Sequence, residues 1–136
     1  METLAIRLKP GMDLKDELSN LVKKNKIKSG FIITCVGSLQ GINIRLSDLS
    51  IYSKKENFEI LSLVGTLCGD GLHLHISISD STGKAFGGHL LNGNIIHTTA
   101  EIVLGCESSF KFKRELDKQT NFKELKIEHF KLSHFV

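Results

Sequence analysis

Three histidines in the middle of the chain have the residue type and spacing of a metal site. His73 and His75 are separated by one residue in an alternating polar and apolar segment, and His89 follows Gly87-Gly88. Alternate side chains of a β-strand share a face, so His73 and His75 would lie about 7 Å apart on one face. Imidazole binds Zn, Fe, Ni or Cu, and three protein ligands leave one position open. The pattern therefore predicts a site for zinc or another transition metal at His73, His75 and His89.

Two carboxylates are candidates to support such a site. Asp80 directly follows the segment that holds the first two histidines, and Glu101 lies in an apolar segment that begins near His97. A carboxylate in an apolar strand must be paired, protonated or turned to water. Carboxylates also orient metal-bound imidazoles by hydrogen bonding. Asp80 or Glu101 could have that role here, and Glu101 could instead be a structural hydrogen-bond acceptor.

The same histidines also have explanations that need no metal. Polar side chains are common on the solvated face of a strand, so all three could be structural or surface residues. Ser77 and Ser79 share the predicted face with His73 and His75, but this spacing alone does not make a catalytic triad. The sequence contains no Gly-x-Ser-x-Gly motif and no phosphate-binding or dinucleotide-binding glycine motif. The metal site and the structural histidines remain the two main hypotheses.

The elements that would position these residues are one helix followed by many short strands. Pro10-Gly11 predicts a turn, Asp13 a helix N-cap, and the next apolar residues fall on one helical stripe, namely Leu14, Leu18, Leu21 and Val22. Strand-like runs then cover residues 31–36, 42–46, 58–67, 73–79, 95–104, 110–113 and 122–127. With 136 residues, the chain has the length of one domain. We expect a single α+β domain with a mostly antiparallel sheet.

Composition restricts the classes of partner. The formal net charge is +3, and only three residues are arginine, namely Arg7, Arg45 and Arg114. A surface that reads base edges in DNA would need more arginine than this. The sequence shows no signal peptide and no apolar run of the ~18 residues that a membrane span needs. Three cysteines without a Cys-x-x-Cys pair are expected to be buried, reduced thiols, so we expect a cytoplasmic protein without a membrane partner.

Several motifs in a fixed order resemble a known family, the PPC (plants and prokaryotes conserved) domain, which occurs in plant AT-hook nuclear-localised proteins and as stand-alone prokaryotic proteins. The motifs cover nearly the whole chain. They are Gly30-Phe31-Ile32, Val36-Gly37-Ser38-Leu39, the run from Asn57 to Leu67, the run from Gly71 to Asp80, Gly87-Gly88-His89-Leu90, the run from Thr98 to Leu104, and Thr120-Asn121-Phe122-Lys123-Glu124-Leu125.

The resemblance implies a fold, an assembly and a site. The fold would be one PPC domain over residues 1–136, with a mostly antiparallel sheet and flanking helices, assembled as a homotrimer. The family's histidine positions match His73, His75 and His89, which the resemblance implies can hold a metal ion. Stand-alone members are commonly described as candidate DNA-binding proteins, but the Arg-Gly-Arg-Pro core of the AT-hook is absent from this sequence. Any DNA binding would then be weak and non-specific.

Two functions from different classes follow. The first is a homotrimeric module for assembly and ligand binding, a candidate DNA-binding protein that lacks an AT-hook and could also bind other proteins. The second is a metal-dependent, hydrolase-like enzyme in which His73, His75 and His89 hold zinc and Glu101 or Asp80 acts as base. The sequence favours the module and leaves enzymatic activity open.

Overall fold

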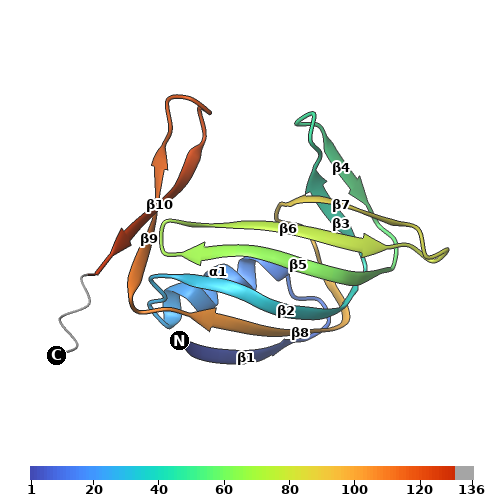
Figure 1. Ribbon diagram of the computed structural model, residues 1–136. Helices are drawn as coiled ribbons and strands as arrows, with labels where there is room; N and C mark the ends of the chain where they lie inside the picture. The colour runs from blue at the N-terminus through green and yellow to red at the C-terminus, as the bar shows by residue number, and fades with distance from the viewer. Residues whose placement is uncertain (131–136) are drawn as a thin grey trace.

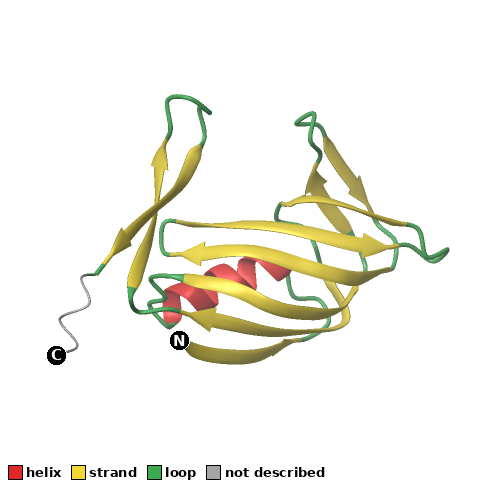
Figure 2. Cartoon of the chain, in the orientation of Figure 1, coloured by secondary structure: helices red, strands yellow, loops and turns green. Residues whose placement is uncertain are grey.

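The computed structural model describes residues 1–130. They form a long antiparallel sheet, one helix and a separate two-stranded hairpin (Figures 1 and 2). The elements are β1 (Glu2–Leu8), α1 (Leu14–Lys24), β2 (Gly30–Leu39), β3 (Ile42–Arg45), β4 (Ile51–Lys54), β5 (Phe58–Cys68), β6 (Gly71–Ser79), β7 (Ala85–Leu90), β8 (Ile96–Cys106), β9 (Phe110–Leu116) and β10 (Lys123–His129). The eight strands of the sheet run in the order β1-β8-β2-β5-β6-β7-β3-β4, and all their pairings are antiparallel. The predicted fold class is confirmed.

Helix α1 begins and packs as its sequence pattern predicts. The Asp13 side chain accepts a hydrogen bond from the backbone N–H of Asp16 at 3.0 Å, which caps the first turn and is worth about 1 kcal/mol. Leu14, Leu18 and Val22 are fully or almost fully buried against the sheet. The resemblance implied flanking helices, but residues 1–130 contain only this one. A single amphipathic helix covers the core face of the sheet (Figure 1).

Seven predicted strands are confirmed, and three strands were not predicted. The three are β1 and β4, which pair with only one neighbour each, and β7, which contains Gly87-Gly88. A glycine pair lowers strand propensity, so the sequence of β7 does not indicate a strand. In the fold these glycines allow close strand contact. A Cβ on Gly87 would lie 2.0 Å from the carbonyl oxygen of Ile76 in β6, and one on Gly88 would lie 2.6 Å from that of Arg45 in β3.

The sheet has a second face, opposite α1, which we call the open face. On β2 and β5 it carries four large apolar side chains that are 47–56% exposed, namely Ile33, Val36, Leu61 and Val64. Cys35 and Leu63, which directly precede Val36 and Val64, are buried in the core, and a register shift in each strand interrupts the strict alternation at Ile33 and at Leu61. Two hairpins, β3–β4 and β9–β10, rise on either side of the open face (Figure 1). No helix within residues 1–130 has the length and apolar character needed to cross a membrane.

The cysteines are all free thiols. Cys35 and Cys68 are buried, as predicted, whereas Cys106 at the end of β8 is only partly buried. Burial raises the pKa of Cys35 to about 12, and burial followed by the charge of Glu2 raises the pKa of Cys106. The thiol form is therefore the stable form at both positions.

Candidate metal centre

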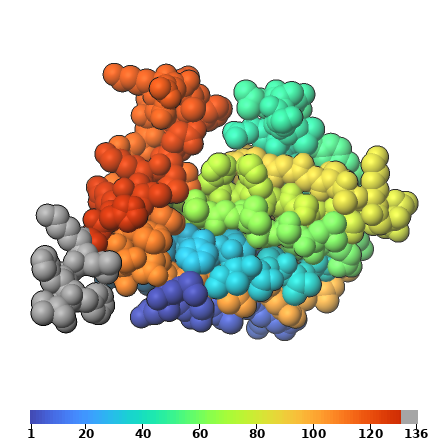
Figure 3. Space-filling model, in the orientation of Figure 1, coloured from blue at the N-terminus to red at the C-terminus, as the bar shows by residue number. Residues whose placement is uncertain are grey.

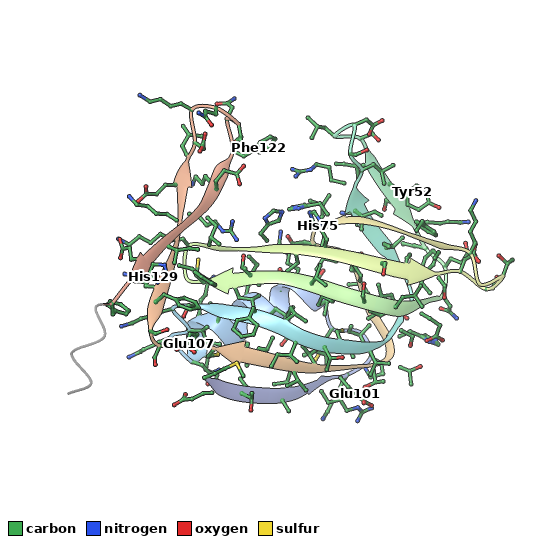
Figure 4. All side chains as sticks on the ribbon, viewed as in Figure 1. Tyr52, His75, Glu101, Glu107, Phe122 and His129 are labelled. Atoms are coloured by element: carbon green, nitrogen blue, oxygen red, sulfur yellow. The ribbon has the colours of Figure 1, made fainter. Side chains whose placement is uncertain are left out.

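The three histidines predicted as ligands lie on two neighbouring strands. His73 and His75 project from β6, because Leu74 and Ile76 between and beside them are buried in the core. His89 projects from β7, where it is paired in register with His75. The close approach of the Gly87-Gly88 backbone to β6 and β3 brings β7 into this position. Figure 4 shows His75 on the side of the sheet from which the hairpins rise.

The imidazole rings converge. The Nε2 atoms of His73 and His75 are 3.3 Å apart, and one potential ligand atom from each of the three histidines lies within 4.8 Å of the others. Two nitrogens bound tetrahedrally to zinc at about 2.05 Å lie roughly 3.3 Å from each other. The His73–His75 distance fits that geometry without adjustment. Among residues 1–130 this is the one cluster of three or more potential ligands with such spacing.

The third histidine has an unsatisfied atom. Among the described residues, Nδ1 of His89 is buried and has no hydrogen-bond partner. Burial, and then the positive charge of Arg45, lower the pKa of His89 to about 4, and burial is also the main cause of the lowered pKa of His73. Both imidazoles are neutral near pH 7, so each has a free lone pair. A buried nitrogen without a partner and neutral rings in contact are what a bound transition metal would require.

The structure does not bring the two predicted supporting carboxylates to this cluster. The carboxylate of Asp80 accepts hydrogen bonds from Thr82 and Lys84 in the turn after β6, and those from Thr82 do most to lower its pKa. Glu101 is exposed on β8, beside Arg7 and Val36, with β2 and β5 between it and β6. Figure 4 shows it far from His75. Alternation along a strand predicts the face of a side chain, but it does not predict which strands become neighbours.

Other residues line the groove beside the histidines. A groove of about 360 Å³ is bordered by His73, His89, Arg45, Arg114 and Glu124, together with Asp70, Gly71, Leu72, Phe122 and Lys123. A second groove of about 300 Å³ borders His73 and His75 on the side of β5, and it shares Arg114 and Glu124. Glu124 comes from β10, and one of its carboxylate oxygens accepts a hydrogen bond from the Thr120 hydroxyl at 2.9 Å. Glu124 lies in the sequence motif over residues 120–125, but nothing in the sequence of this motif shows that it lies beside β6.

Comparison with known proteins identifies the family. Residues 1–107 match the family model of the Plants and Prokaryotes Conserved (PCC) domain. The chain belongs to this family. It is the family, also written PPC, that the sequence motifs resemble. All three histidines and the groups around them from β3, β6 and β7 lie within the matched part, whereas β9 and β10, with Arg114 and Glu124, lie beyond it.

Relatives of this PCC domain occur alone and within larger proteins. The chain is 44% identical to the bifunctional protein GlmU of two Synechococcus strains over 124 residues, but it spans only 20% of the length of those proteins. A hypothetical protein from Salmonella enterica is 33% identical and superposes with a TM-score of 0.91 over 94% of each chain. Two more distant structures show the same fold. They are a candidate DNA-binding protein from Bacteroides thetaiotaomicron (22% identity, TM-score 0.78, 93% and 91% of the two chains) and a metal-containing protein from Archaeoglobus fulgidus (22%, 0.72, 91% and 92%).

Proposed function

We propose that this PCC-domain protein is a ligand-binding module built around a transition-metal ion that His73, His75 and His89 hold. The observation that carries the proposal is the convergence of three imidazoles, with potential ligand atoms within 4.8 Å of one another. When bound, such an ion supplies a Lewis-acid centre with an open coordination position. The Archaeoglobus protein of the same fold is named metal-containing, which supports the proposal.

Metal analysis of protein produced without a histidine tag tests the site. We expect about one zinc or related ion per chain, and the titrated affinity should fall more than about 100-fold in His73→Ala or His89→Ala, because removing a ligand costs more than removing a residue that only orients one. His97→Ala is the matched control, since His97 is exposed on β8 and its Nδ1 lies 3.2 Å from the Thr98 hydroxyl. A wild-type protein that binds no transition metal would overturn the proposal.

The module is proposed to assemble as a homotrimer in the cytoplasm. The number of subunits comes from the family resemblance, and the apolar side chains of the open face support a subunit contact there. Exposed apolar clusters on a folded domain commonly mark interfaces. Val64, one of these residues, is paired in register with His75, so a subunit on the open face would lie next to the histidine cluster.

DNA binding is proposed only as a weak, non-specific property. The name of the Bacteroides protein supports DNA binding. The chain's formal net charge of +3 would also be repeated in each subunit of a trimer. Contacts between lysines and phosphates are sequence-independent and weaken steeply with salt. A gel shift at near-physiological salt is the test, and an absence of retardation at micromolar protein would remove DNA from the list of partners.

A metal-dependent hydrolase is the second candidate function. Glu124 favours it, because this carboxylate lines the same groove as His73 and could act as a general base. Under this alternative, zinc-loaded protein hydrolyses an activated ester, and Glu124→Gln loses the activity while it retains zinc. If the zinc-loaded wild-type protein does not hydrolyse such esters faster than free zinc does, the hydrolase is excluded and only the ligand-binding module remains as the proposed function.

A further inference from the structure

Two of the three arginines in the chain line the groove beside the histidines. Arg45 is the last residue of β3, and Arg114 lies on β9 in the opposite hairpin. Both are half-buried, and both border the groove of about 360 Å³ together with His73 and His89. The third arginine, Arg7, lies on β1 at the far edge of the sheet. Figure 3 shows the two hairpins standing above the rest of the surface with a hollow between them.

The guanidinium groups of Arg45 and Arg114 have few partners within the described residues. No carboxylate in residues 1–130 forms an ion pair with either. Arg114 donates one hydrogen bond, from Nη2 to the Thr66 hydroxyl at 2.6 Å, and Arg45 lies over the ring of Phe122 at 5.6 Å. A guanidinium carries five N–H donors, so most of them remain available to a ligand.

The acidic residues of the groove, Asp70 and Glu124, do not form ion pairs with these guanidinium groups. Asp70 accepts from the backbone N–H of Arg114 at 3.2 Å, and Glu124 accepts from Thr120. Two half-buried cations without a directly paired carboxylate are unfavourable, and a divalent metal beside them would add to the repulsion. An anion between the arginines and the histidines would relieve both effects.

We propose that this groove binds a small oxyanion, namely the carboxylate or phosphate group of a small molecule, between Arg45, Arg114 and the three-histidine centre. The inference rests on the proposed metal site and deepens it, because it names the class of ligand. A guanidinium presents paired donors that match the oxygens of carboxylate and phosphate. The volume of the groove is that of a small-molecule site.

Calorimetric titration with sulfate and acetate, at constant ionic strength, tests the proposal. Sulfate represents a phosphate group and acetate represents a carboxylate group. The anion that binds with the higher affinity identifies the chemical class of the ligand. We expect saturable binding to zinc-loaded protein that weakens roughly tenfold or more in Arg45→Gln and in Arg114→Gln, because each removes a charge-assisted hydrogen bond. Arg45→Lys and Arg114→Lys should fall between wild type and the glutamine variants. Arg7→Gln is the matched control and should bind as wild type does.

Thermodynamic linkage between zinc binding and sulfate binding supplies a second measurement. If the anion and the metal relieve each other's charge, sulfate must raise the affinity for zinc by the same factor by which zinc raises the affinity for sulfate. Zinc binding without anion binding, or equal anion affinities in Arg45→Gln, Arg114→Gln and Arg7→Gln, would overturn this inference and leave the metal centre intact. Absence of zinc binding would instead overturn the proposed function. Saturable, arginine-dependent sulfate binding to the metal-free protein would then still support the anion groove.

Discussion

Burial governs the chemistry of Cys35. Its side chain lies in the core between β2 and the helix layer, and burial raises the pKa of the thiol to about 12. The thiolate is the nucleophile in alkylation, so a thiol with this pKa reacts slowly even in mildly alkaline buffer. We predict that iodoacetamide at about pH 8.5 leaves Cys35 unmodified in the folded protein and modifies it fully in denaturant.

Cys106 is the internal reference for that measurement. It is partly exposed, so it should react before Cys35, and peptide mass spectrometry after timed labelling gives the order directly. Rapid labelling of Cys35 under native conditions would show that β2 opens locally on the time scale of the reaction, which contradicts the closed core seen here.

Pairing between elements determined which residues could be predicted from the sequence. His73 and His75 were predicted to share a face because strand alternation is a local property. Helix α1 was predicted for the same reason, since its cap and stripe lie within one segment. Arg45, Arg114 and Glu124 reach the histidines only because β7 pairs with β3 and because the β9–β10 hairpin stands beside β6. Such long-range pairings leave no signal in a single sequence. The sequence therefore does not predict the groove, and it offers Asp80 and Glu101, rather than Glu124, as the carboxylates that support the histidines.

The contact between β6 and β7 depends on Gly87. A Cβ at this position would lie 2.0 Å from the carbonyl oxygen of Ile76, and the backbone on both sides cannot give way without breaking the strand pair. We predict that Gly87→Ala lowers the free energy of unfolding by at least about 2 kcal/mol. The substitution should also weaken zinc binding, because it moves His89 away from His75.

Gly69→Ala is the matched control for this prediction. Nothing lies within 4 Å of a Cβ at Gly69, and the residue sits in the turn between β5 and β6. Its unfolding free energy, measured by urea titration, should stay within about 0.5 kcal/mol of the wild type. Equal stabilities for the two alanine variants would contradict the close strand contact described above.

The open face exposes apolar side chains to water in a single chain, and nothing within residues 1–130 of that chain covers them. Ile33, Val36, Leu61 and Val64 lie on adjacent strands on one side of the sheet, and each is about half exposed. Burying such side chains stabilises an association by about 25 cal/mol for each Å² of apolar surface removed from water. If the proposed trimer forms through this face, sedimentation should give about three times the chain mass of 15.1 kDa.

Charge introduced at the open face tests that contact. A carboxylate at position 36 would be buried without a partner in the proposed trimer but would face water in the monomer, so Val36→Asp should dissociate that trimer without unfolding the chain. Asn20→Asp adds the same charge on the exposed side of α1, opposite the open face, and should leave the mass unchanged. Because Val64 is paired in register with His75, the dissociated variant should also expose the histidine cluster more fully to chelators, so that the removal of bound zinc becomes faster. A wild-type protein that sediments as a monomer, or a Val36→Asp variant that keeps the wild-type mass, would place the subunit contact elsewhere or remove it.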